Sequence, residues 1–175
     1  MKTEIDHTRR SAVLSEDGVY RYSLTREWGP EGACKRVLFV MLNPSTADAE
    51  KDDPTIRKCM GFAARLGFNA LEVVNLFAFR ATYPHDLVAA HALGADIVGR
   101  ENGRTISDAI DRASLVICAW GAYDRENLVW SHAMKLLKHI ERHPQIRCLG
   151  RCKDELNPRH PLMLAYATGL ERYPS

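Results

Sequence analysis

The sequence has no long apolar run, no strong excess of one charge and no repeated segment. No stretch approaches the roughly 20 apolar residues that a helix needs to cross a bilayer, and the polar start Met1-Lys2-Thr3-Glu4 has no apolar signal-peptide core. The 24 basic residues are balanced by 22 acidic ones, so any surface that binds nucleic acid must be local. We therefore expect a cytoplasmic protein with no membrane partner.

Regularly paired cysteines are also lacking. The five cysteines are scattered and odd in number, which favours free thiols over a disulfide framework in a chain without an export signal. Cys148 and Cys152 lie close in sequence, but their spacing differs from the CxxC form of common zinc sites. The sequence predicts neither a metal site nor a cofactor.

The chain contains enough apolar sequence for one core. At 175 residues and 46% hydrophobic, it has the size of one ordinary domain, and no Pro- or Gly-rich linker divides it. We predict a single domain over residues 1–175. Residues 1–30 are predicted to form a β-hairpin appendage, because two strand-like segments flank the turn-forming Asp17-Gly18. Residues 31–175 are predicted to form an α/β core.

Apolar strands alternate with amphipathic helices in this core. The predicted strands span residues 36–42, 71–77, 114–120 and 146–150, and the predicted helices span residues 53–66, 95–113 and 126–142. The first strand is a continuous apolar run, which is typical of a strand covered on both faces. The alternation predicts a three-layer α/β/α sandwich with a mostly parallel central sheet.

Polar residues gather where these strands end. In parallel sheets a ligand binds outside the carboxyl ends of the strands. The first strand runs into Asn43-Pro44-Ser45-Thr46, which is either a candidate binding site or a plain asparagine turn. Asn75 interrupts an apolar strand, where an unpartnered amide would cost about 1 to 3 kcal/mol. Its amide is therefore either bonded to backbone or reads the edge of a planar ligand such as a base.

Further candidates follow the later strands. The segment Asn157-Pro158-Arg159-His160-Pro161 holds an imidazole between two prolines that restrict the backbone. His160 is therefore either a positioned donor or a surface histidine. A basic cluster is predicted to bind phosphates, the alternative being charges on a solvated rim; it comprises Arg80, Arg151, Lys153 and Arg159. Three aromatic side chains can stack on a base or pack in the core; they are Phe77, Trp120 and Tyr123.

Four of these segments, taken in order, resemble the uracil-DNA glycosylase superfamily. They are Met41-Leu42-Asn43-Pro44-Ser45, Val74-Asn75-Leu76, Cys118-Ala119-Trp120-Gly121 and Arg159-His160-Pro161-Leu162. From about residue 21 to residue 173 the chain is also similar to the bacterial family catalogued as domain of unknown function 1643. That similarity includes Leu42-Asn43-Pro44-Ser45-Thr46-Ala47-Asp48 and Asp53-Pro54-Thr55.

The first resemblance implies a uracil-DNA glycosylase-like fold and hydrolysis of an N-glycosidic bond in DNA, with the base flipped out of its stack. It implies that Asn43 positions the attacking water, Asn75 recognises the base edge and His160 donates to the departing base. Asp48 or Asp53 would supply the general base that an asparagine cannot be. The alternatives are a non-catalytic nucleotide or nucleic-acid binding module, and a hydrolase of free nucleosides or nucleotides.

Overall fold

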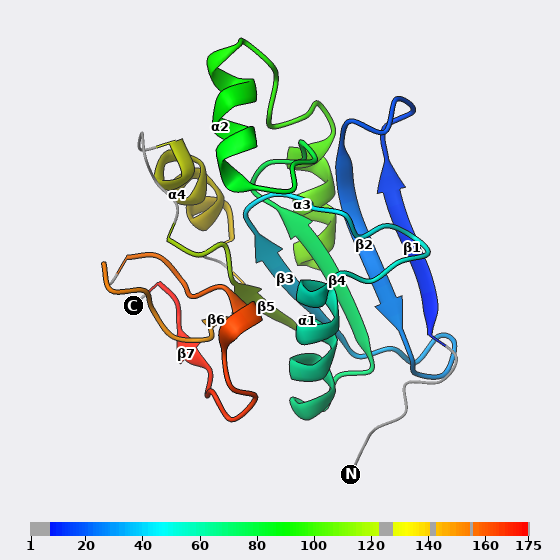
Figure 1. Cartoon of the computed structure of the whole chain (residues 1–175). Helices are drawn as coiled ribbons and strands as arrows, with labels where there is room; N and C mark the ends of the chain where they lie inside the picture. The colour runs from blue at the N-terminus through cyan, green and yellow to red at the C-terminus, as the bar shows by residue number, and fades with distance from the viewer. Residues whose placement is uncertain (1–7, 123–127, 141–142, 155, 175) are drawn as a thin grey trace.

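The computed structural model describes residues 8–122, 128–140, 143–154 and 156–174. A seven-stranded sheet in the order β1-β2-β4-β3-β5-β6-β7 forms its centre (Figure 1). The strands are β1 (Arg9–Leu14), β2 (Arg21–Glu27), β3 (Arg36–Met41), β4 (Ala70–Asn75), β5 (Leu115–Cys118), β6 (Ile146–Cys148) and β7 (Glu171–Arg172). The helices are α1 (Pro54–Arg65), α2 (Pro84–Ala92), α3 (Asn102–Asp111), α4 (Leu128–Ile140) and the short 3₁₀ helix η1 (Pro161–Met163).

The sheet is mixed. Its four central strands, β4, β3, β5 and β6, are parallel, as the alternation of strands and helices predicts. Both sides of the sheet are antiparallel, because β2 pairs antiparallel with β4 and β7 pairs antiparallel with β6. The expectation of a mostly parallel sheet therefore holds for the centre and is wrong for the edges.

Helices cover both faces of the sheet, so the three predicted layers are present. Helix α1 packs on one face through side chains such as Ile56 and Phe62, which join Phe39 of β3 in one buried cluster. Helices α2, α3 and α4 pack on the other face, where Leu87, Ile106 and Leu136 belong to a second buried cluster. None of the helices in the described ranges is long and apolar enough to span a membrane.

The predicted N-terminal hairpin is confirmed, but it is not an appendage. Strands β1 and β2 pair antiparallel, and Gly18 has a φ of 70° in the turn between them. Strand β2 then pairs with β4, and Leu24 has no exposed surface. The hairpin therefore extends the central sheet, and the start of β2 lies beside the carboxyl end of β4.

The helix α1 begins and ends as the sequence predicts. Asp53 is its N-cap and accepts a hydrogen bond from the Ile56 amide at 2.8 Å, Pro54 occupies the first turn, and Gly67 follows its end with a φ of 79°. The prediction of one helix over residues 95–113 is wrong in its first third. There Asp96 accepts from the amides of residues 98 and 99, which favours a turn, and α3 begins only at residue 102.

Candidate functional site

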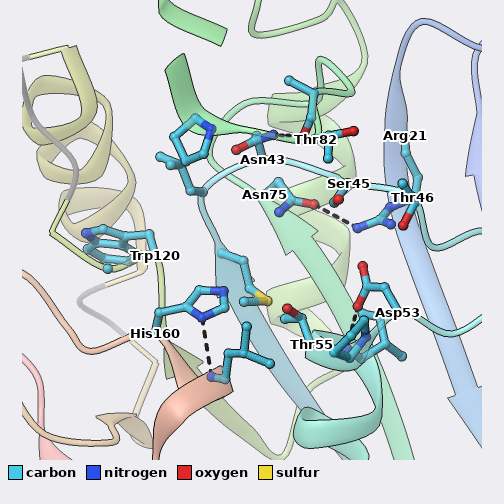
Figure 2. Close-up of a pocket in the computed structure, with 18 of the residues that line it drawn as sticks. Arg21, Asn43, Ser45, Thr46, Asp53, Thr55, Asn75, Thr82, Trp120 and His160 are labelled. Atoms are coloured by element: carbon cyan, nitrogen blue, oxygen red, sulfur yellow. Dashed lines mark hydrogen bonds between the residues drawn. The ribbon is translucent and has the colours of Figure 1, made fainter. Parts of the chain in front are cut away.

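A pocket of about 540 Å³ lies at the carboxyl ends of β3, β4 and β5 (Figure 2). It is bounded by the turn after β3, the start of α1, the segment after β4 and the loop that leads into η1. Its polar lining consists of Arg21, Asn43, Ser45, Thr46, Asp53, Thr55, Asn75, Thr82, Trp120 and His160. Six of the residues predicted to form a site are therefore brought together on the predicted rim: Asn43, Ser45, Thr46, Asn75, Trp120 and His160.

The amide of Asn43 has a fixed orientation. Its Nδ2 donates to the carbonyl oxygens of Ala81 at 2.8 Å and Pro44 at 3.1 Å. Because only the NH₂ group can donate to carbonyls, the side-chain oxygen Oδ1 is turned away from them. Asn43 therefore joins the turn after β3 to the segment after β4 and offers an acceptor at the pocket wall.

Asn75 lines the pocket from the last position of β4 and is almost fully buried. Its Oδ1 accepts from Arg21 Nη2 at 3.4 Å, so its partner is a side chain and not the neighbouring backbone considered from the sequence. Its backbone carbonyl accepts from the side-chain Nδ2 of Asn102 at 3.1 Å. Since Oδ1 faces Arg21 (Figure 2), the NH₂ group of Asn75 is left to donate to a ligand.

His160 projects into the pocket as a neutral donor. Its Nδ1 accepts from the Leu162 amide at 3.3 Å at the start of η1, which leaves the ring hydrogen of the neutral form on Nε2. Burial lowers the pKa of His160 below its ordinary value, and the nearby Asp53 carboxylate opposes this only in part. The ring is therefore uncharged at neutral pH and presents Nε2–H to the cavity (Figure 2).

Close backbone contacts hold the His160 loop in place. The Gly121 amide donates to the Pro158 carbonyl at 2.9 Å, and the Arg159 amide donates to the Gly150 carbonyl at 2.9 Å. Gly121 has a φ of 80°, and an added Cβ there would lie 3.4 Å from the Cβ of His160. Glycine at residue 121 therefore permits both the backbone turn and the close approach of the loop.

Asp53 is the carboxylate that lines the pocket in the described part of the chain, and Asp48 is not among the lining residues. The Oδ1 of Asp48 accepts from the amides of Glu50 and Lys51, both at 2.8 Å. Hydrogen bonds from these two amides hold the pKa of Asp48 below its ordinary value. Asp48 therefore organises its own loop, while Asp53 caps α1 and faces the cavity.

Four other predicted site residues line neither this pocket nor the one that adjoins it. Phe77 is fully buried and contacts the ring of His132, with centroids 4.8 Å apart, so it is a core residue. Pro44 is buried, and its carbonyl accepts from the Ala81 amide at 2.9 Å. Arg80 donates to the Gly18 carbonyl at 3.2 Å.

Asn157, the fourth of these residues, supports the pocket from behind. It is buried, and its Oδ1 accepts from Trp120 Nε1 at 3.1 Å. Trp120 is 2% exposed and lines the cavity at its edge. Asn157 thus fixes the tryptophan and does not itself face a ligand. Tyr123, the third aromatic candidate, lies outside the described residues.

A second pocket of about 570 Å³ adjoins the first. The two share Gly121, Ala122 and His160. Arg151, Lys153 and Arg159 line the second pocket, so three of the four predicted basic residues are gathered beside the first one. Arg80 is separate from them, on the side of the N-terminal hairpin.

The sequence reasoning missed Arg21, Thr55 and Thr82 as pocket residues. Arg21 is 3% exposed, and it reaches the site because β2 starts where β4 ends. No local sequence pattern signals this position, because it depends on the pairing of β2 with the distant strand β4. Among the described residues, no group of three or more His, Cys, Asp or Glu side chains is placed to hold a metal ion.

Residues 21–162 match the family described as protein of unknown function (DUF1643). The chain belongs to this family. The DUF1643 match begins at Arg21 and ends at Leu162, and both of these residues line the pocket. No curated protein and no solved structure matches the chain.

Proposed function

We propose that the chain is a uracil-DNA glycosylase-like protein that binds a nucleobase in the first pocket and hydrolyses its N-glycosidic bond. The observation that supports this most strongly is the meeting of Asn43, Asn75 and His160 in one cavity with the carboxylate of Asp53. These residues come from three distant segments of the chain, because Asn43 and Asp53 both lie between β3 and α1. A cavity of this size, apolar with a few convergent polar groups, is typical of a small-molecule site.

Each polar group has a chemical role in this reaction. The NH₂ of Asn75 donates to an acceptor on the base edge, and Nε2–H of His160 donates to the base as it leaves with the bonding electron pair. Asp53 accepts a proton from the water whose oxygen forms the new bond to the sugar carbon. The Oδ1 of Asn43 accepts the other hydrogen of that water and so orients it.

The second pocket provides support for a DNA substrate. Arg151, Lys153 and Arg159 place positive charge directly beside the base pocket, where the phosphates flanking a flipped nucleotide would lie. The balanced net charge of the chain is compatible with this, because three basic residues line the second pocket.

The proposed reaction is tested with single- and double-stranded DNA containing uracil, hypoxanthine, xanthine or alkylated bases, and with the matching nucleosides. Abasic sites or released base are measured. Asp53→Asn keeps an oxygen that can cap α1 but removes the general base, and we expect the rate to fall about 10²- to 10⁴-fold. Asp108→Asn, an exposed position on α3, is the matched control and should leave the rate unchanged.

Two results would contradict this assignment. If Asp48→Asn abolished the activity and Asp53→Asn did not, the carboxylate would have been assigned wrongly. If no substrate gave abasic sites or free base while a nucleobase ligand still bound, the protein would be a non-catalytic binding module.

A further inference from the structure

Arg21 is a buried cation at one end of the first pocket. The residue as a whole is 3% exposed. No carboxylate oxygen of the described residues lies within 4.0 Å of its charged nitrogens, which is the limit for an ion pair. Nη1 donates to the Ala47 carbonyl at 2.8 Å and Nη2 to Asn75 at 3.4 Å. Nε–H has no partner among the described residues. A buried charge in this state is costly unless an anion binds it.

Burial and neighbouring charges both affect the charged form of Arg21. Burial lowers its pKa to about 10, with Arg80 and Arg26 adding to the effect and Asp53 and Asp48 opposing it. Desolvation is thus the largest effect on this guanidinium, and charges of both signs surround it. An incoming anion would offset the desolvation.

Neutral donors lie beside this cation. Figure 2 shows Ser45 and Thr46 next to Arg21 at the same end of the pocket. Their hydroxyl groups make no hydrogen bond to the rest of the described chain. The Oδ1 of Asn75 is taken by Arg21, so Asn75 can act toward a ligand as a donor through its NH₂. This end of the cavity is therefore rich in donors.

We propose that Arg21, Asn75, Ser45 and Thr46 form an oxyanion subsite, and that the substrate carries a negatively charged phosphate or carboxylate group at this end of the pocket. The proposal deepens the function proposed above and rests on it in taking this pocket as the substrate site. Asp53 does not block the subsite, because its Oδ1 is engaged at the start of α1 and it makes no ion pair with Arg21.

A nucleotide phosphate and a carboxylate on the base would place the base at different positions in the pocket. The phosphate and the base edge of a nucleotide lie at its opposite ends, so a phosphate at Arg21 would put the base beside Trp120 and His160. A carboxylate carried on the base itself would put the base against Asn75. In both cases the anionic group enters the first pocket together with the base, because Arg21 lines that pocket and is almost fully buried.

The test begins with the wild-type protein. Inorganic phosphate and acetate are titrated while the NMR signal of the Arg21 Nε–H group is followed, and we expect a saturable shift. Calorimetry then compares uridine with uridine monophosphate, and uracil with orotate, because the members of each pair differ by one anionic group. The anionic member should bind about tenfold more tightly or better. A larger preference for uridine monophosphate over uridine identifies phosphate as the bound group, and a larger preference for orotate over uracil identifies carboxylate.

Two variants locate the effect. Arg21→Gln should remove the preference for the anionic member, whereas Arg104→Gln, an exposed position on α3, should keep it. The proposal is overturned if the wild-type signal does not saturate, or if the preference survives Arg21→Gln. If Arg21→Gln does not fold, the wild-type titration together with Ser45→Ala decides, since that variant should weaken anion binding. If the anions bind at Arg21 but no base is bound or released, the subsite stands and the nucleobase function fails.

Discussion

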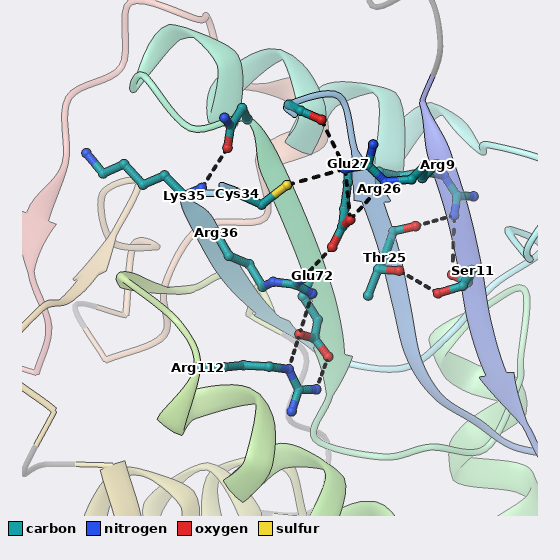
Figure 3. Close-up of polar contacts among 12 residues, drawn as sticks. Arg9, Ser11, Thr25, Arg26, Glu27, Cys34, Lys35, Arg36, Glu72 and Arg112 are labelled. Atoms are coloured by element: carbon teal, nitrogen blue, oxygen red, sulfur yellow. Dashed lines mark hydrogen bonds and ion pairs between the residues drawn. The ribbon is translucent and has the colours of Figure 1, made fainter. Parts of the chain in front are cut away.

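Strand β4 carries Glu72 in its first half and Asn75 at its carboxyl end. The buried charge at the first position has ion-pair partners, whereas the buried charge beside the second has none in the described part of the chain. Glu72 has no exposed surface and accepts hydrogen bonds from Arg112, through Nε at 2.8 Å, and from Arg36 at 3.3 Å (Figure 3). Three residues along the strand, Asn75 meets Arg21, a buried cation without an acidic partner in the described part of the chain.

The same contrast occurs within β2. Arg26 is fully buried, but it forms an ion pair with Asp52 at 2.7 Å and donates to the Asp48 carbonyl at 2.6 Å. It thereby ties the loop before α1 to the sheet. Buried charges that serve the fold are thus paired and hydrogen-bonded, as their desolvation requires. The buried charge that lacks such a partner lines the pocket, which is typical of a group kept for a ligand.

The largest effect is expected at Glu72. Glu72→Gln would leave Arg36 and Arg112 without their shared anion, and breaking a buried ion pair costs about 3–5 kcal/mol. The free energy of unfolding, measured by urea denaturation, should fall by that amount. Glu171→Gln, on the exposed edge strand β7, is the matched control and should change it by less than about 0.5 kcal/mol.

If Glu72→Gln lowered the free energy of unfolding as little as Glu171→Gln, the ion pairs of Glu72 with Arg36 and Arg112 would not stabilise the sheet. The contrast between the two halves of β4 would then have no energetic basis.

A smaller difference is expected between two Arg→Met changes in β2. Among the described residues, Arg26→Met leaves the exposed Arg10 as the one ion-pair partner of the partly buried Asp52. The change should lower the free energy of unfolding by about 3 kcal/mol. Arg21→Met removes an unpaired buried charge while losing two hydrogen bonds, so the net change should be within about 1 kcal/mol. Parallel urea denaturation measures both. If Arg21→Met were the more destabilising change, Arg21 would be a structural residue.

The parts of the fold predicted from sequence are those where one residue decides the local backbone. Asp53-Pro54 starts α1, Gly67 ends it, and Asp17-Gly18 turns the hairpin, because each acts within a few residues. The apolar runs also locate the carboxyl ends of the central strands, and Asn43, Asn75 and His160 line one pocket there.

The rest depended on pairing between distant segments. No local pattern shows that β2 adds to β4, so the sequence could not bring Arg21 to the site. Local pattern also cannot separate a strand-end aromatic that stacks on a ligand from one that fills the core, and Phe77 is in the core. Asp48 and Asp53 look alike in sequence, yet the amides of Glu50 and Lys51 hold the first while the second caps α1 and lines the pocket.

The smallest effect concerns the neutral state of His160. Burial lowers its pKa in the folded chain below the ordinary value of 6.5, so between these two values the unfolded chain binds more protons. The contribution of His160 to stability is therefore complete above about pH 7 and is lost as the pH falls below 6.5. The free energy of unfolding is measured by urea denaturation from about pH 7.5 to about pH 5 for wild type and His160→Gln. Subtracting the variant profile cancels the other titrating groups, and the stability of wild type relative to the variant should decrease with acidification. A difference that grew instead would mean that His160 is charged in the folded protein and pairs with Asp53, which would remove the neutral donor from the proposed site.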